Sequence, residues 1–224
     1  MPGHDRRAAA APPDPTRERL VTAATGLFAD RGFKRVTVRE ICRAARANVA
    51  AVNYHFGGKL GLYGAVVDVA VAAMRDTNQL AMDAGQGLPA EQALGEFVRV
   101  FLARVTGGRH LAWIHKLITR ELEDPTGALD VVMRDVIRPR HAHLAGLLAA
   151  IMGLPPDDDR VFRAVASLQG QILVFARPLP PSVPDMWTRV ADDVPAAADH
   201  VTAFTIAGAR ASAQLPRPHA AGGD

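Results

Sequence analysis

The chain has 224 residues, of which 49% are hydrophobic and 22% charged, a composition that indicates a folded globular protein and excludes an intrinsically disordered chain. Cys42 is the only cysteine, which excludes an intramolecular disulfide and a thiolate zinc site within one chain. The start of the sequence lacks the apolar segment of a secretory signal, and no apolar run approaches about 20 residues, so we expect a cytoplasmic protein without membrane contact.

The net charge of +3 is unevenly distributed along the chain. Residues 16–60 contain nine lysines and arginines but three acids, a local charge of +6, whereas the residues beyond position 60 are slightly acidic. A basic N-terminal module of this kind indicates a polyanionic partner, with phosphate as the obvious candidate.

Alanine and leucine at helical spacing predict an all-α fold. After a disordered tail over 1–14, a first helix is expected to open at Thr16, after Pro15, and to close at Gly32. The TVRE sequence at 37–40 is a capping box that predicts a second helix, ending near Ala45.

A third short helix is predicted over 49–56, with Asn48 as its N-cap and two glycines, Gly57 and Gly58, at its end. A long helix then begins at about Lys59 and continues into the eighties. Further helices are predicted over 89–105, 109–122, 127–152, 157–176 and 195–213, and Pro139 should kink or break the third of these. The resulting domains are a helix-turn-helix domain over 15–62 and a helical domain over 63–214, followed by a disordered tail over 215–224.

Two short helices joined by three residues and followed by a long helix match a helix-turn-helix, whose second helix enters the major groove of DNA. On a helical wheel, Val49, Val52 and Phe56 fall on one side of the third helix, where they can pack on Phe28 and Ile41. The opposite side is therefore predicted to face DNA.

The residues of that opposite side suit a DNA groove. Ala50 and Ala51 allow close approach and can touch a thymine methyl, while Asn53 can pair with an adenine edge or a phosphate. Tyr54 and His55 offer donors to phosphates. Thr37 and Lys59 lie at helix N-termini, which already favour an anion. Simpler roles stay open for three residues: Asn48 as a cap only, His55 as a helix-terminal surface residue, and Tyr54 as a packed ring with a solvated hydroxyl.

Residues 16–66 resemble the DNA-binding domain of the TetR family of transcriptional regulators over its whole length. The similarity is carried by AATGLFADRGF, TVREIC, YHF and GGKLGLY. It implies a homodimer that binds a palindromic operator, usually as a repressor released by a small molecule. The positions that match the family's DNA contacts are Thr37, Asn48, Ala50, Ala51, Asn53, Tyr54, His55 and Lys59.

The turn of the helix-turn-helix departs from that family, because Arg46 and Ala47 replace the common glycine and valine. If residue 46 needs a positive φ, arginine adopts it at a cost on the order of 1 kcal/mol. Arg46 is also a candidate phosphate contact, with a solvated surface arginine as the alternative.

The remaining chain is similar to a narrower subgroup, the CecR-type (also CerR-type) regulators, through RELEDPTGALD, VIRPRHAHL, SLQGQILVFARP and ADHVTAFTIAGA. This resemblance implies a helical domain for effector binding and dimerisation, without enzymatic chemistry. Small side chains on the helices at 161–175 and 196–213 allow close helix approach, so both are dimer candidates, although they could instead pack inside the monomer. The candidate dimer residues are Phe162, Ala166, Gly170, Ala203, Ala207 and Arg210.

For a small-molecule effector, the helix at 109–122 is the most suggestive, because polar side chains interrupt its apolar stripe. The candidate ligand-binding residues are Trp113, His115, Arg120, Glu121, Gln169, Gln171 and Arg177. Arg120 could equally form a surface ion pair with Glu121 or Glu123, and Trp113 could be core.

Two other classes of protein fit the sequence less well than a regulator. An enzyme is disfavoured, because no nucleophile motif or phosphate loop is present and the two histidines of HAH at 141–143 do not face each other on a helix. We expect no metal or cofactor. An architectural DNA-binding protein without an effector would not need the second helical domain.

Overall fold

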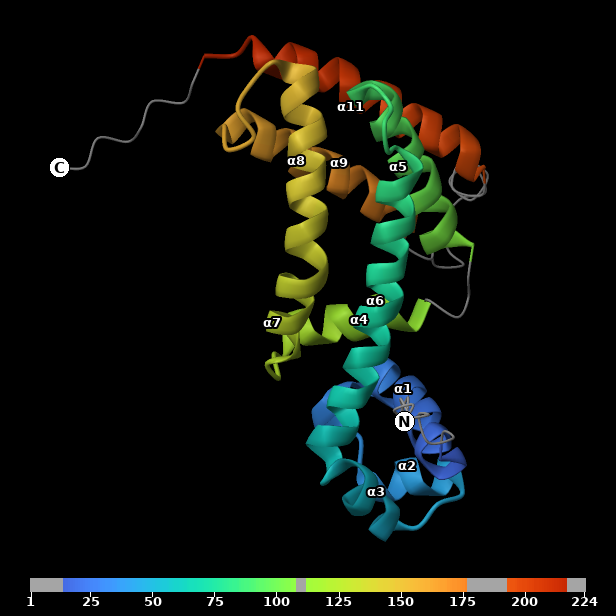
Figure 1. The fold of residues 1–224 in the computed structure, drawn as a ribbon. Coiled ribbons are helices and arrows are strands. Elements are labelled where there is room, and N and C mark those ends of the chain that lie inside the picture. The colour runs from blue at the N-terminus through green and yellow to red at the C-terminus, as the bar shows by residue number, and fades with distance from the viewer. Residues whose placement is uncertain (1–13, 108–111, 177–192, 217–224) are drawn as a thin grey trace, which may run out of the picture. The chain divides into compact units, whose positions relative to one another are not determined.

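The computed structural model describes residues 14–107, 112–176 and 193–216. Every regular element in these ranges is a helix, which confirms the predicted all-α class (Figure 1). The chain divides into two compact units, Met1–Asp68 and Val69–Asp224. The predicted disordered tails lie outside the described residues, apart from Asp14, Leu215 and Pro216.

The first helix, α1, spans Pro15–Arg35 and is interrupted at Gly32, whose φ of 76° and ψ of 166° are not helical. The expected end of the helix at Gly32 is therefore a break, after which one further turn follows. The start was predicted at Thr16, but the helix begins at Pro15. Asp14 is its N-cap, because one carboxylate oxygen accepts the amide hydrogens of Thr16 and Arg17 at 2.8 and 3.4 Å.

The next three helices follow the predicted boundaries closely. Helix α2 spans Val38–Ala45, helix α3 spans Val49–Phe56 and helix α4 spans Lys59–Ala84. The backbone amide of Gly57 donates to Asn53, and Gly57 adopts a left-handed conformation with φ of 69°, which ends α3.

The core of the first unit combines α1, α2, α3 and the start of α4. Its fully buried side chains are Leu20, Ala24, Phe28, Val36, Ile41, Val52, Leu62 and Val66. Phe28 meets Tyr63 edge to face at 5.0 Å between ring centroids. The predicted inner position of Val52 is confirmed, and Phe56 is half-buried, with the Arg17 guanidinium 5.4 Å from its ring centroid. The inner position of Val49 is wrong, since the side chain at this first helical position is 42% exposed.

The second unit is a bundle around α5 (Ala90–Thr106), α8 (Arg138–Met152), α9 (Asp159–Ala176) and α11 (Val194–Ala213). Helix α11 packs on each of the other three, and α5 packs on α8 and α9. Buried leucines, valines and phenylalanines of these helices form one apolar cluster, to which α4 adds Ala81. Helix α6 (Ala112–Glu123) packs on the short α7 (Ala128–Val132).

The segment predicted as one helix over 127–152 is divided as Pro139 requires. Helix α7 is followed by a π-helical turn, η2 (Met133–Ile137), and then by α8. Pro139 has no amide hydrogen to donate to the carbonyl of Asp135. That carbonyl instead accepts from Arg75 Nε at 3.4 Å, and the next carbonyl, of Val136, accepts from Asn78 Nδ2 at 3.0 Å. Side chains of α4 thus satisfy the backbone groups at the break.

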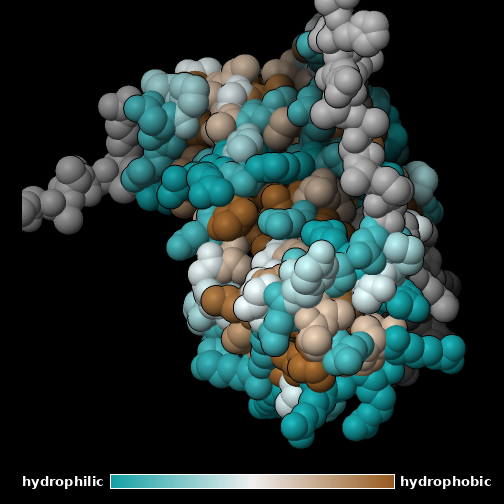
Figure 2. All heavy atoms as spheres, turned by 60° about the horizontal axis from the view of Figure 1, so that its bottom comes forward, coloured by the Kyte–Doolittle hydropathy of each residue, from teal (hydrophilic) through white to brown (hydrophobic). Residues whose placement is uncertain are grey.

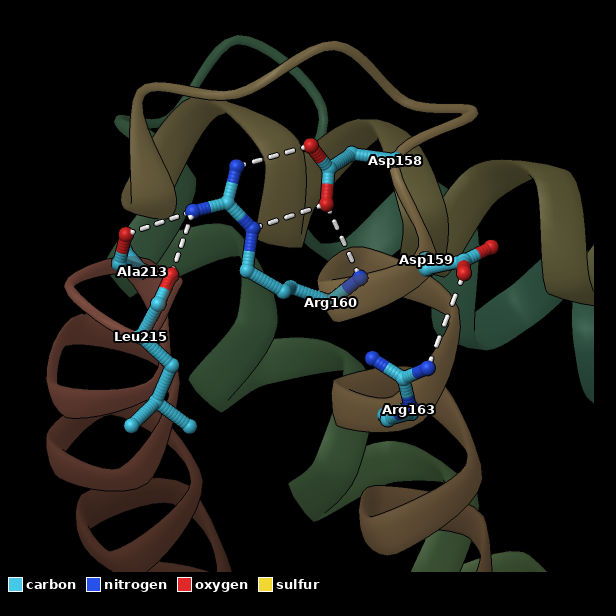
Figure 3. A network of polar contacts seen from close by, with 6 residues as sticks. All are labelled: Asp158, Asp159, Arg160, Arg163, Ala213 and Leu215. Carbon is cyan, nitrogen blue, oxygen red and sulfur yellow. Dashed lines mark hydrogen bonds and ion pairs between the residues drawn. The ribbon is translucent and has the colours of Figure 1, made fainter. Parts of the chain in front are cut away.

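A polar network ties the start of α9 to the end of α11 (Figure 3). Arg160 forms a two-point ion pair with Asp158, through Nε at 2.9 Å and Nη2 at 2.8 Å. Its Nη1 donates to the carbonyls of Ala213 and Leu215 at 2.9 and 3.0 Å. Arg160 therefore caps the last turn of α11, which leaves carbonyls without helical partners.

No single described helix is both long and apolar enough to cross a membrane. Helices α3 and α4, which are bent by 64° at their junction, meet the length and composition test only as a pair.

Candidate DNA-binding site

The turn between α2 and α3 is built on Arg46. This residue has φ of 50° and ψ of 48°, in the left-handed region, and is the only described residue other than glycine with a positive φ. Its amide donates to Arg43 at 3.3 Å, and the amide of Ala47 donates to Cys42 at 2.9 Å, which closes α2. The side chain is exposed. Arg46 therefore has the positive φ that the sequence left open.

The outer face of α3 presents a small polar surface. Ala50 and Asn53 are exposed, Ala51 is half-buried, and the Tyr54 side chain is 85% exposed. Tyr54 is therefore not packed, which excludes the simpler role that the sequence left open. In Figure 2, which turns the α2 and α3 end toward the viewer, hydrophilic side chains surround a smaller apolar area.

Two other predicted DNA contacts have intramolecular partners. Asn48 is the N-cap of α3, as predicted, since its Oδ1 accepts the amide hydrogen of Ala50 at 3.0 Å, and its DNA contact stays a prediction. The His55 side chain is only 12% exposed, and its Nε2 lies 3.5 Å from Asp14 Oδ2. The hydrogen bonds from the backbone amides of Thr16 and Arg17, and then the nearby His55, lower the pKa of the Asp14 carboxyl. His55 thus joins the end of α3 to the start of α1.

Thr37 and Glu40 form the predicted capping box at the start of α2. The Thr37 hydroxyl accepts the amide hydrogen of Glu40 at 3.3 Å, and Glu40 Oε2 accepts from the Thr37 amide at 2.8 Å. Arg31 Nη1 donates to Glu40 Oε1 at 2.7 Å, a contact that the sequence analysis missed. The ion pair with Arg31 and the bonds from Thr37 lower the pKa of Glu40 to about 2. The N-terminus of α2 is therefore fixed in position.

Lys59, at the start of α4, is held over an aromatic ring. Its Nζ lies 4.3 Å from the centroid of Phe33, a cation–π contact. Partial burial lowers the pKa of the Lys59 ammonium, and the Glu40 charge opposes that shift. Lys59, Phe33 and Glu40 bring the starts of α2 and α4 together, so the predicted phosphate contacts Thr37 and Lys59 belong to one surface.

The predicted ligand-binding residues are dispersed. Arg120 pairs with Glu123 at 2.9 Å, which realises the surface ion-pair alternative, and Glu121 is only 1% exposed, with its carboxylate accepting from the Thr126 amide and hydroxyl at 3.1 and 2.9 Å. Gln171 donates to Ser167 and Thr205 at 3.4 Å. Trp113 and His115 are half-buried, and Arg177 lies outside the described residues. A described cavity of about 350 Å³ is lined by none of these residues but by Arg160, Arg163, Ser212, Leu215 and Pro216.

The predicted dimer residues are exposed in the single chain, whereas other faces of α9 and α11 pack inside the monomer, as the alternative predicted. On α9, Phe162, Ala166 and Gly170 follow each other at four-residue spacing, and on α11 the exposed Ala203 and Ala207 do the same. Phe162 is 61% exposed, and Phe204 of α11 is 62% exposed. Arg210, the last of the predicted set, pairs with Glu91 of α5.

The second unit also contains a cation, Arg140, that was not among the predicted site residues. Arg140 of α8 lies with its guanidinium 5.2 Å from the centroid of Phe101 on α5. One turn along, the His143 ring lies 5.7 Å from that of Phe97. Spacing was the sequence signal for these contacts: Arg140 and His143 are three residues apart, and Phe97 and Phe101 are four apart, so each pair lies on one face of its helix.

A basic helix-turn-helix unit joined to a separate helical unit defines a transcription regulator that binds DNA. Residues 20–66 match the model of the bacterial regulatory proteins of the tetR family, and residues 90–209 match the C-terminal domain of the HTH-type transcriptional dual regulator CecR. The chain belongs to the TetR family and carries a CecR-type C-terminal domain. Members of this family bind DNA operators and are not enzymes, which confirms the predicted class.

Among individual relatives, the HTH-type transcriptional dual regulator CecR of Shigella flexneri is 32% identical over 168 residues, 71% of this chain and 74% of that protein. The probable HTH-type transcriptional regulator YttP of Bacillus subtilis (strain 168) is 43% identical over 47 residues, 21% of this chain and 23% of that protein. A TetR-like transcriptional regulator from Rhodococcus sp. RHA1 has a TM-score of 0.63 at 20% identity and covers 88% of this chain and 98% of its own. The fatty acid degradation regulator FadR from Bacillus halodurans has a TM-score of 0.58 at 17% identity, and the match covers 88% of this chain and 98% of that chain. At these identities the structural likeness supports the fold alone.

Proposed function

We propose that the protein is a homodimeric repressor that binds a palindromic operator through two copies of α3 and is released by a small-molecule effector. The observation that best supports this proposal is the outer face of α3. Ala50, Asn53 and Tyr54 are exposed there, while the other side of the helix is anchored by the buried Val52. Such a face can lie in a major groove, with the alanines allowing close approach and Asn53 reading a base edge.

The proposed dimer joins α9 and α11 of two copies in a four-helix arrangement. Exposed small residues at four-residue spacing form a shallow ridge on each helix, which allows close packing of a second copy. The large exposed side chains beside them, Phe162, Leu173, Val174 and Phe204, would be buried by that packing. A second copy is the favoured occupant because a palindromic operator needs two recognition helices related by a two-fold axis.

The dimer is tested by Phe204→Glu, which places a charge in the proposed interface. We expect this variant to sediment as a monomer and to lose operator affinity. Leu122→Glu is the matched control, since Leu122 is 64% exposed on α6, and it should remain dimeric. If Phe204→Glu stays dimeric, α9 and α11 are not the interface.

DNA binding is tested on an operator found by footprinting near the protein's own gene, with random DNA as a comparison. Lys59→Ala should weaken binding to both DNAs and lower the salt slope by about 0.9 per released phosphate contact. Asn53→Ala should also reduce the preference for the operator. Equal losses in both variants on both DNAs would contradict these roles. Half-sites should lie about 34–36 Å apart or a multiple of this.

Release by an effector separates a repressor from an architectural DNA-binding protein. Adding small molecules to the operator complex, monitored by fluorescence anisotropy, should release DNA from a repressor but not from an architectural protein. The Shigella flexneri relative is named a dual regulator, so the assay should detect both an increase and a decrease in transcript. A rise in transcript on deletion of the gene supports repression, whereas a fall indicates activation.

A further inference from the structure

Arg140 is a half-buried cation whose position is set by the antiparallel contact of α8 and α5. Its guanidinium lies over Phe101, and His143, one turn along α8, lies against Phe97. The two phenylalanine rings stack on each other at 5.6 Å between centroids with an interplanar angle of 13°. The guanidinium of Arg140 therefore lies against one ring of a stacked phenylalanine pair.

No carboxylate in the described part of the chain pairs with Arg140, and burial alone lowers the pKa of its guanidinium to about 10. The acids of α5, α9, α11 and η2, the elements with the most extensive contact to α8, are all paired with other arginines. These pairs are Glu91 with Arg210, Glu96 and Asp199 with Arg99, Asp159 with Arg163, and Asp135 with Arg75 and Arg134. Helix α8 itself contains no acid.

A partly desolvated guanidinium without a counter-charge is costly, and folded proteins usually supply a partner from within the chain. The contact with Phe101 satisfies one face of the group but none of its five N–H donors. On α9, which packs on both α5 and α8, the buried Gln169 Nε2 also has no acceptor among the described residues. A carboxylate would provide the acceptor that the Arg140 guanidinium lacks.

We propose that Arg140 binds the carboxylate of the effector, so that the effector is a monocarboxylate with an apolar or aromatic body. This inference rests on the proposed release by a small molecule and names the chemical class that the second unit recognises. One guanidinium matches one carboxylate in a two-point interaction. The surrounding rings favour an apolar body, and Arg140 is half-buried rather than enclosed, so a ligand can reach it.

The test measures binding to the full-length protein without DNA, by calorimetry, with phenylacetate and the uncharged phenylacetamide as matched probes. Wild type should bind phenylacetate at least about tenfold more tightly than the amide. Arg140→Gln should lose that preference, and Arg140→Lys, which keeps the charge without the planar fork, should retain part of it. Arg138→Gln is the control, because it removes the same charge from an exposed position on the same helix, and it should behave as wild type.

Thermal unfolding distinguishes a ligand-binding arginine from a structural one. Arg140→Gln removes an unpaired cation, so its midpoint should equal or exceed that of wild type. The proposal is overturned if this variant is less stable, if its preference for phenylacetate survives, if both probes bind wild type equally, or if phenylacetate shows no saturable binding up to about 10 mM.

The same variants separate this inference from the regulatory proposal. If phenylacetate binds through Arg140 but never releases the operator, the carboxylate site stands and release by an effector fails. If another small molecule releases DNA equally from wild type and Arg140→Gln, the regulator stands and the carboxylate site is wrong.

Discussion

Replacement of Arg46 by glycine tests how the helix-turn-helix tolerates its unusual turn. A left-handed conformation costs an ordinary residue roughly 1–2 kcal/mol, whereas glycine adopts it without strain. Glycine also makes the unfolded chain more flexible, which offsets about 0.4–1 kcal/mol of the gain. Since Arg46 has φ of 50° and no side-chain partner among the described residues, we expect Arg46→Gly to be more stable than wild type by about 1 kcal/mol.

Arg46→Ala is the matched control, because it removes the same side chain but keeps the strained backbone. Urea unfolding should place Arg46→Gly above Arg46→Ala by about 1 kcal/mol, and thermal midpoints should differ by about 2–4 °C. Gly57→Ala should show the reverse, with a loss of more than about 1 kcal/mol, because Gly57 has φ of 69°. Equal stability of the glycine and alanine variants at position 46 would show that the turn is not strained.

The same two variants report on DNA. If Arg46 contacts a phosphate, both should lower the salt slope of operator binding equally, by about 0.9 per protomer. A solvated Arg46 would leave both slopes at the wild-type value.

Substitutions at Phe28, Glu40 and Arg160 test the packing and charges of the two units. Phe28→Ala should cost about 3–5 kcal/mol in urea unfolding, because the ring is fully buried, and Phe28→Leu should cost less. The pKa of Glu40 is lowered to about 2, so its stabilising effect is present above the ordinary value of 4.5 and is lost as pH falls towards 2. Glu40→Gln should therefore flatten the fall of the thermal midpoint with pH over this range. An unchanged profile would contradict the contacts of Glu40 with Arg31 and Thr37. Arg160→Lys should lower the thermal midpoint, because lysine cannot bind Asp158 at two points while capping α11, whereas Arg163→Lys should change little.

Local rules predicted most of the first unit. The capping box at Thr37, the cap at Asn48 and the glycine after Phe56 are backbone signals that act within four residues, so the sequence displays them directly. Asp14 caps α1 because Pro15 occupies the first helical position, which proline favours, so the helix starts one residue before the predicted Thr16. The buried position predicted for Val49 was wrong because a helical wheel treats every position alike, whereas the first residue of a short helix lies at its exposed end.

The second unit was harder to read, since its polar contacts join residues far apart in the chain. Pro139 predicted a break in the helix. The π-helical turn found there has two carbonyls that accept from Arg75 and Asn78, so it depends on α4 lying beside it, which the sequence does not display. Glu121 was expected in a pocket, yet it caps the segment around Thr126, five residues later. The counter-charges of the other arginines near α8 come from α5, α9, α11 and η2, so the isolation of Arg140 emerges only from the fold.

Two of the departures from regular structure in the described residues lie at the proposed sites. One is the strained turn at Arg46, directly before α3. The other is where α4, η2 and α8 meet: a π-helical turn, the buried Asn78 Oδ1 without a donor, and Arg140 without a counter-charge. Natural proteins keep such costly features mainly where function requires them. In the first unit that place is the turn before the proposed recognition helix, α3. By the same reasoning, the region around η2 and Arg140, rather than the well-satisfied α6, is where a ligand would supply what the chain lacks.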